Sequence, residues 1–155
     1  MPMPVSTWVE VDLDRFAANL RAIRSAVGNA CDLLLVAKAD AYGHGAREMA
    51  AAAEREGVSQ LGVATLHEGL QLRLAGCSLP IVALSPLLTA EIDDAVAHGI
   101  DPTVADDEFA RTLSAAAQGA RRPVRFHVEI DTGMGRIGVR EEQAEEFVAR
   151  VAALP

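Results

Sequence analysis

The stretch LLLVAKADAYGHG, residues 33–45, determines how the rest of the chain is interpreted. It opens with a short apolar run, and such runs between turn signals are typical of strands that are buried on both faces. Lys38 stands at the end of this run, before Gly43 and Gly45. Burial disfavours the ammonium form of a lysine, and the neutral amine is the nucleophile that forms Schiff bases. Lys38 is therefore a candidate nucleophile, and the ordinary alternative is a lysine whose ammonium group extends into water.

Outward from this stretch, apolar strand-like segments alternate with amphipathic helix-like segments. Five predicted strands are each followed by a predicted helix; the strands are 33–37, 61–66, 81–84, 102–105 and 124–130, and the helices are 46–56, 67–75, 89–98, 107–118 and 141–153. Such alternation predicts βαβ units and a parallel sheet. Five strand–helix pairs fit either an open doubly wound sheet or part of a (β/α)₈ barrel.

The predicted N-terminal segments precede these five pairs. Residues 8–13 alternate apolar and acidic side chains, which predicts a half-buried strand. Asp14 then has the character of an N-cap for a helix that ends at Gly28.

Composition narrows the class of protein. The 155 residues suit one domain, and half of them are hydrophobic. A net charge of −8 argues against nucleic acid as a partner, because its backbone attracts clustered Lys and Arg. No apolar run has the length of a membrane span, and the residues at 1–4 do not resemble a signal peptide. We therefore expect a cytoplasmic protein without a membrane partner.

The cysteine and histidine residues give no signal for a disulfide framework or a metal site. Cys31 and Cys77 are isolated, which fits a reduced compartment. The four histidines lack metal-ligand spacing, and no Cys-x-x-Cys is present. We expect no metal.

Three stretches together resemble one family. Residues 36–45, VAKADAYGHG, resemble the cofactor-lysine motif of the alanine racemases, which are pyridoxal-phosphate enzymes of the barrel type. Residues 7–13, TWVEVDL, resemble the family's opening segment, and Asn19-Leu20 continues it. Residues 131–138, DTGMGRIG, resemble its arginine-bearing motif. The likeness extends from Thr7 to the last residue.

The resemblance favours the barrel over the doubly wound sheet. It implies an α/β fold, a partial (β/α)₈ TIM-type barrel with about five βα units. Residues 1–13 would include a strand that pairs with a C-terminal β-domain absent from this sequence, and residues 14–155 would form an incomplete cofactor-binding barrel. We therefore expect the N-terminal portion of a longer enzyme; the alternative is a short open α/β protein.

The resemblance also assigns roles to individual residues. Lys38 would bind pyridoxal 5′-phosphate as a Schiff base and act as the base on the D-enantiomer face. The Tyr42 hydroxyl would bind the cofactor phosphate. Arg136 would contact the substrate carboxylate and the cofactor's phenolic oxygen, since a guanidinium can donate two parallel hydrogen bonds to a carboxylate. Glu129 stands where the family often has a lysine, carbamylated in some members, and we expect it to pair with Arg136.

The function implied is that of an alanine racemase, which interconverts L- and D-alanine, supplies D-alanine for bacterial peptidoglycan and works as a homodimer. The family's opposite-face tyrosine, the arginine at the pyridine nitrogen and the later phosphate-binding loop have no counterpart in this sequence. We therefore expect the 155-residue chain alone not to racemise amino acids. The alternatives are a non-catalytic pyridoxal-phosphate-binding barrel protein and an amino-acid racemase of broader specificity.

Two further features are less specific. Residues 133–138 fit G-x-G-x-x-G, but only 17 residues follow, too few for the strand and acidic residue of a dinucleotide site. Ser85, at the end of a predicted strand, is a candidate to line the cofactor pocket, although an ordinary turn explains it equally well.

Overall fold

The computed structural model of the chain describes residues 7–155. Strands and helices alternate along it almost from end to end. In chain order the elements are α1 (Leu13–Val27), β1 (Leu34–Val36), α2 (Lys38–Gly43), α3 (Ala46–Arg55), β2 (Gln60–Val63), α4 (Leu66–Leu74), β3 (Ile81–Ala83), η1 (Thr89–Glu91), α5 (Ile92–His98), β4 (Ile100–Asp101), β5 (Thr103–Val104), α6 (Asp107–Ala120), β6 (His127–Val128), β7 (Ile130–Asp131), β8 (Val139–Arg140) and α7 (Glu141–Ala152).

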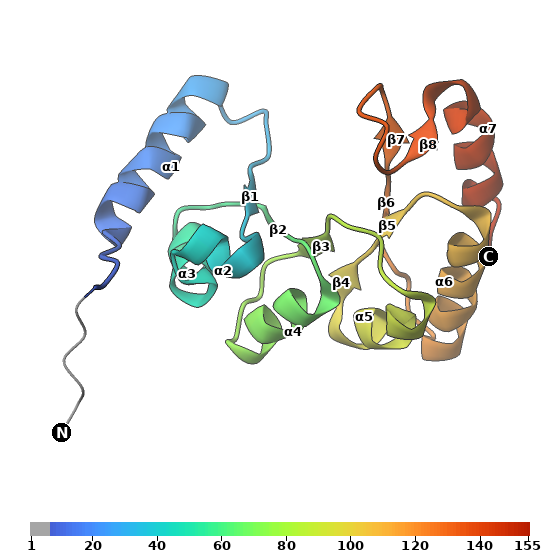
Figure 1. Cartoon of the computed structure of the whole chain (residues 1–155), viewed down its shortest axis with the longest axis horizontal. Helices are drawn as coiled ribbons and strands as arrows, with labels where there is room; N and C mark the ends of the chain where they lie inside the picture. Colours follow the sequence, from blue (N-terminus) through green and yellow to red (C-terminus); the bar gives the residue numbers. More distant parts are fainter. Residues whose placement is uncertain (1–6) are drawn as a thin grey trace.

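The strands are parallel and follow one another in sequence order. β1, β2, β3 and β4 form one sheet, β5 pairs with β6, and β7 pairs with β8. Figure 1 shows the main helices arranged in an arc along one side of the strands. The five predicted strand–helix pairs are all present, and this order is that of a partial α/β barrel, as predicted.

Pro102 divides the fourth barrel strand into β4 and β5. Proline has no N–H to donate to the ladder, so the ladder with β3 is interrupted there. The hydroxyl of Thr103 donates to the Ala83 carbonyl at 2.6 Å. A buried side chain thus provides a link between these two strands beyond the interruption.

The core lies between the strands and the helices outside them. Leu61, Ile81 and Ile100 are at most 1% exposed, and burial of such a side chain contributes about 1.5–3 kcal/mol. Small residues allow the close approach of helices and strands. A Cβ at Gly69 of α4 would lie 2.7 Å from Ile100 Cδ1, so this helix could not pack as closely with a larger residue.

Acidic and hydroxyl side chains begin several helices. α4 has a reciprocal capping box between Thr65 and Glu68, and Asp106 accepts from the Phe109 amide at the start of α6. For α1 the prediction of Asp14 as the cap was wrong. Asp12 has the extended backbone of an N-cap, and its side chain accepts from the amides of Asp14 and Arg15.

Arg73, in the last turn of α4, binds four carbonyl oxygens. Its guanidinium donates to Cys77 and Leu79 at 2.9 and 2.7 Å, on the chain leading into β3. It also donates to His98 and Gly99 at 3.1 and 2.9 Å, where α5 ends. One side chain thereby connects two successive βα units.

Residues 7–12 are not part of a strand, although the sequence predicted one over residues 8–13. A strand requires a neighbour to share its hydrogen bonds, and the described residues supply none here. Trp8 and Val9 are 74% and 75% exposed. Residues 1–6 of the predicted N-terminal segment lie outside the described residues, and its pairing with a further β-domain stays a prediction.

Over the described part of the chain, no helix has the length and apolar character needed to cross a membrane.

Candidate active site

Lys38 begins a turn with unusual backbone geometry. The preceding residue, Ala37, continues the sheet by donating to the Gly62 carbonyl at 2.7 Å. The next four residues, 39–42, are all left-handed, with φ of 50–55° and ψ of 38–51°. None of them is glycine, and this conformation costs L-residues roughly 1–2 kcal/mol each. The segment α2 is therefore a strained left-handed turn.

Hydrogen bonds hold this strained turn at both ends. Near its start, the Ala39 amide donates to Glu68 Oε1 at 2.8 Å. At its far end, the Ala46 amide donates to Asp40 Oδ1 at 2.7 Å and the Gly45 amide to the Asp40 carbonyl at 3.0 Å. Strained backbone persists where its surroundings determine it in this way, and such sites are often functional.

Sequence reasoning found only part of this turn. Gly43 and Gly45, the glycines that follow Lys38 in the motif, have φ of 81° and 87°, as a sharp turn of the backbone requires. The left-handed residues before them were missed, because nothing in the types Ala, Asp and Tyr requires positive φ. Glu68 was missed as well, although its spacing from Thr65 is the signal of a capping box.

The predicted residues Lys38, Glu129 and Arg136 line one cavity of about 370 Å³. They come from opposite ends of the described sheet order, Lys38 after β1 and the other two beside β6 to β8. The other residues of the wall are Leu34, Ala64, Val82, Leu84, Ser85, Thr103, His127 and Val128. The cavity thus brings together the lysine and arginine motifs, which are nearly a hundred residues apart.

Tyr42 is not among the residues that line this cavity. Its side chain is 61% exposed, and its ring centroid is 5.9 Å from Lys38 Nζ. An ammonium group at this distance from an aromatic ring is attracted to it. The structure thus places Tyr42 next to Lys38, and its role toward a phosphate stays a prediction.

The expected ion pair between Glu129 and Arg136 is absent. No ion pair within 4.0 Å joins them among residues 7–155. Glu129 Oε2 is buried and receives no hydrogen bond, whereas Arg136 is exposed. The guanidinium keeps its hydration on an exposed loop, so the prediction of a direct pair was wrong for this structure.

Asp131 organises the loop that carries Arg136. Its carboxylate accepts from the Gly133 amide at 2.9 Å and from the Gly135 amide at 3.0 Å. Hydrogen bonds from Gly135 and Gly133 stabilise the charged form and lower the pKa of Asp131. The Val139 amide closes the loop by donating to the Glu129 carbonyl at 2.8 Å.

Three polar residues complete the cavity wall. Ser85 lines it, as its position at the end of a strand indicated. The Thr103 hydroxyl donates a hydrogen bond to the Ala83 carbonyl, and His127 Nε2 lies 3.3 Å from the Gln60 side-chain nitrogen. Sequence reasoning did not select Thr103 or His127 for this site, because both lie inside the predicted strands 102–105 and 124–130 and not after them. Within residues 7–155, no group of three or more His, Cys, Asp and Glu side chains is arranged to hold a metal ion.

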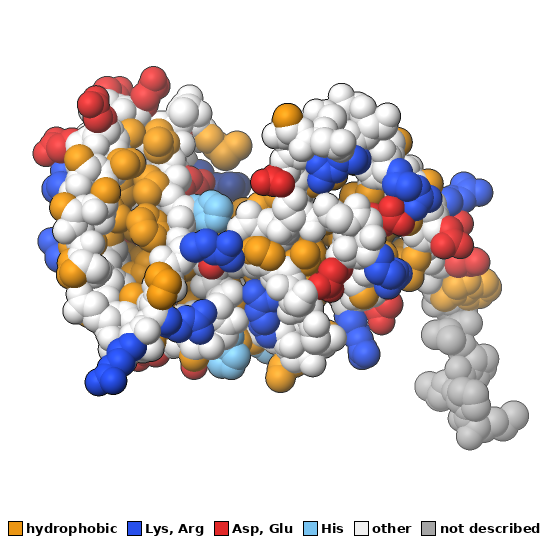
Figure 2. Space-filling view, turned by 180° about the vertical axis from the view of Figure 1, so that it is seen from behind, with side chains coloured by type: hydrophobic (Ala, Val, Ile, Leu, Met, Phe, Trp, Pro, Cys, Tyr) orange, Lys and Arg blue, Asp and Glu red, His pale blue; other side chains and the backbone are white. Residues whose placement is uncertain are grey.

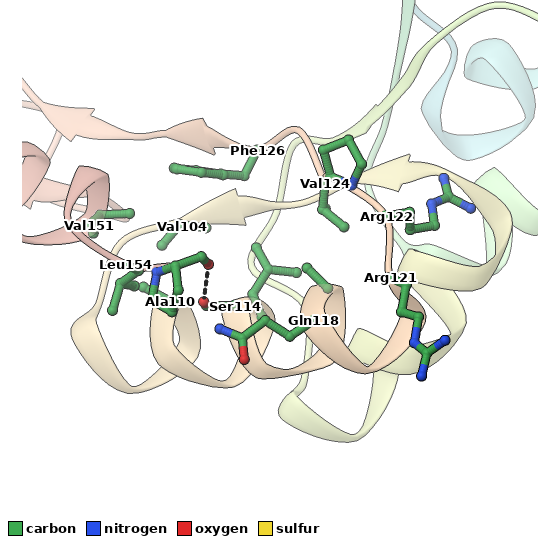
Figure 3. Close-up of a pocket in the computed structure, with 14 residues that line it drawn as sticks. Val104, Ala110, Ser114, Gln118, Arg121, Arg122, Val124, Phe126, Val151 and Leu154 are labelled. Carbon is green, nitrogen blue, oxygen red and sulfur yellow. Dashed lines mark hydrogen bonds between the residues drawn. The ribbon is translucent and has the colours of Figure 1, made fainter.

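A second cavity, of about 480 Å³, lies between α6, the segment before β6 and the end of α7. Figure 3 shows Phe126, Val104, Ala110 and Leu154 around it, with the Ser114 hydroxyl hydrogen-bonded to the Pro155 carbonyl. In Figure 2, apolar side chains gather on the side formed by the C-terminal part of the chain. This cavity shares no residue with the one that contains Lys38 and is mainly apolar.

Comparison with known proteins identifies the family of the chain. The family model described as "Alanine racemase, N-terminal domain" matches residues 11–155. An alanine racemase of Desulfovibrio desulfuricans is 42% identical over 147 residues, which are 95% of this chain and 40% of that protein. One of Halothermothrix orenii is 37% identical over 96% of this chain and 39% of that protein.

Solved structures give the same result. An alanine racemase of Clostridium difficile superimposes with a TM-score of 0.89 at 36% identity, over 99% of this chain and 41% of that one. The same enzyme in complex with cycloserine gives a TM-score of 0.90 at 36% identity, over 99% of this chain and 43% of that one. The chain thus spans about two fifths of the length of the relatives it matches. With the family model matching nearly its whole length, the chain belongs to the alanine racemase N-terminal domain family.

Proposed function

We propose that this chain forms the lysine-bearing part of an alanine racemase active site. The observation that carries the proposal is the single cavity lined by both Lys38 and Arg136. An amine and a guanidinium across one cavity suit a substrate that has an acidic Cα–H and a carboxylate. Alanine is the substrate named by the family, and a racemase of broader specificity would use the same two groups.

The residues present fit pyridoxal phosphate. Lys38 is the only lysine of the chain, and it reaches a cavity with polar groups in its wall. The unpartnered Glu129 Oε2 in that wall leaves room for a donor from a bound molecule. Lys38 would hold the cofactor's carbonyl carbon, and the exposed hydroxyl of Tyr42 would bind its phosphate. When bound, the cofactor supplies an electron sink that makes the α-proton of an amino acid removable.

Arg136 and Lys38 would then have separate roles, one in substrate binding and one in proton transfer. Arg136 would bind the substrate carboxylate through two parallel hydrogen bonds and fix which face of Cα meets Lys38. The neutral Lys38 amine would take the α-proton from that face and return it there. Inversion requires a second base on the other face of Cα, and the family uses a tyrosine there. The only tyrosine of this chain is Tyr42, which is already beside Lys38. The second base would come from a part of the relatives that this chain does not match.

The experiment tests cofactor capture and one-sided proton exchange together. The purified chain with pyridoxal phosphate should develop visible absorbance, and borohydride followed by peptide mapping should place the adduct on Lys38. In D₂O the loaded chain should exchange the α-proton of D-alanine at least tenfold faster than that of L-alanine, without inversion. Lys38→Arg is the matched control, because it keeps a cation and removes the primary amine.

Two results would contradict the proposal. An adduct on the N-terminal amine alone would show that Lys38 is not the cofactor lysine. Racemisation by the isolated chain at roughly 1 per second, an ordinary enzyme rate, would show that both bases are already present.

The cellular location, the oligomeric state and the use of the product are part of the same proposal. We propose that the racemase works in the cytoplasm as a homodimer and supplies D-alanine to peptidoglycan synthesis. Size-exclusion chromatography with light scattering on a chain extended to the relatives' length tests the dimer.

A further inference from the structure

The carboxylate of Glu68 binds three backbone amides from two separate segments. Its Oε2 accepts from the amides of Ala64 and Thr65 at 2.7 and 3.2 Å. Its Oε1 accepts from the amide of Ala39 at 2.8 Å. The first two bonds cap the N-terminus of α4, whereas the third binds a residue 29 positions earlier in the chain.

A second capping glutamate in the same molecule shows what helix capping alone requires. Glu91 accepts from the Leu88 amide at 2.7 Å and completes the capping arrangement of η1. Among the hydrogen bonds of the described residues, that carboxylate has no bond to a distant segment. The bond from Glu68 to Ala39 is therefore additional to the capping role.

The Ala39 amide lies where the backbone leaves Lys38 and enters the left-handed turn. This N–H belongs to the planar peptide unit that joins Lys38 to Ala39, so its orientation sets ψ of Lys38. Ala39 is also the first of the four left-handed residues, with φ of 50°. Without an acceptor in this position, the amide would be free to rotate toward a relaxed backbone. The rotamers open to a side chain depend on φ and ψ, so a change in ψ of Lys38 would change the directions that its amine can take.

We propose that Glu68 is a positioning residue for Lys38, which fixes the amine toward the cavity by holding the Ala39 amide. This inference rests on the function proposed above for Lys38, and it adds a residue outside the cavity wall. Glu68 touches neither cofactor nor substrate in this arrangement and acts only through the backbone.

The test compares Glu68→Gln with Glu91→Gln. Both substitutions replace a capping carboxylate by an amide of the same shape, which keeps one acceptor oxygen. Glu91 uses one oxygen, so the amide can retain that bond. Glu68 uses both oxygens, so the NH2 group must face either the Ala39 amide or the amides of Ala64 and Thr65. Glu68→Asp is the second variant, because it keeps the charge and the place at the start of α4 but is one carbon too short to reach Ala39. Fraction folded is measured for each chain, and rates are expressed per folded molecule.

Three readouts separate positioning from stability. Hydrogen exchange of the Ala39 amide, in the absence of cofactor, should accelerate at least tenfold in Glu68→Gln and Glu68→Asp. Capture of pyridoxal phosphate by Lys38 should slow about tenfold in both, and the visible circular dichroism of the captured cofactor should weaken. Glu91→Gln should match the unaltered chain in all three measurements.

The outcomes are distinguishable. Unchanged capture and unchanged dichroism in both Glu68 variants would overturn the positioning role. Equal losses in Glu91→Gln would also overturn it, because they would show a general effect of lost capping. If the unaltered chain captures no cofactor on Lys38, the proposed function itself fails. The exchange measurement needs no cofactor, so unchanged exchange of the Ala39 amide in the variants would show separately that Glu68 does not hold the turn.

Discussion

The Lys38 turn and the Arg136 loop are two loops that follow strands, contain glycines and face one cavity, yet they are held in different ways. The Lys38 turn is fastened by Glu68 of another helix and packs through Ala41 against Met49. The Arg136 loop is organised by Asp131 at its own start, and residues 132–136 are exposed.

This difference follows the task of each side chain. A covalent bond to a cofactor requires an amine in one place, so a strained backbone with distant supports is useful there. A guanidinium that binds a carboxylate can adjust its long side chain when the ligand arrives. We therefore expect substitutions that crowd the first loop to cost more stability than those in the second, and a substitution of Arg136 in the second loop to affect binding without affecting stability.

The largest expected effect is at Ala41, which is buried and has φ of 52°. Ala41→Val adds a β-branched side chain at positive φ in a packed position, and we expect a loss of about 3 kcal/mol in the free energy of unfolding. Met134→Val in the other loop, where the side chain is 80% exposed, should stay within about 0.5 kcal/mol. Urea unfolding midpoints at constant slope measure both. Equal losses would remove the distinction between the loops.

The next effect is on binding. Arg136→Lys keeps the charge and loses the planar fork, so kcat/KM for α-proton exchange of D-alanine should fall about tenfold, or roughly 1.4 kcal/mol. The melting temperature should not change, because Arg136 is exposed and has no ion pair among the described residues. A lower melting temperature with unchanged exchange kinetics would reverse the roles assigned to the two loops.

The smallest effect concerns Glu129, which lines the cavity that both loops face. Its Oε2 is buried without a donor, so Glu129→Gln removes an uncompensated charge and should raise the free energy of unfolding of the cofactor-free chain by about 1 kcal/mol. Thermal unfolding without cofactor measures this change. A clear destabilisation would indicate that Glu129 pairs with Arg136 in solution after all.

The sequence was sufficient for the order of elements because hydrophobic period and glycine stops are local signals. The apolar run 33–37 and the predicted helix 46–56 matched β1 and α3 to within about a residue of their bounds. Element ends that depend on pairing were less predictable. The segment 124–130 became two short strands around Glu129, whose amide donates to Val104 and whose carbonyl accepts from Val139.

The site was predictable only where a motif was residue-specific. Lys38 and Arg136 were identified through their motifs, and the structure places both on one cavity. The Glu129–Arg136 pair failed because ion pairing depends on loop conformation and solvation, which no spacing encodes. The left-handed turn and its bond to Glu68 were missed because they join segments 29 positions apart.

Arg73 has a consequence for how the molecule opens. Its four carbonyl partners belong to the entrance of β3 and the end of α5, so neither segment can detach without breaking two hydrogen bonds to the guanidinium. Partial unfolding should then proceed in blocks larger than a single strand–helix unit. The middle of the chain would behave as one cooperative block, and fluctuations at either end would leave it intact.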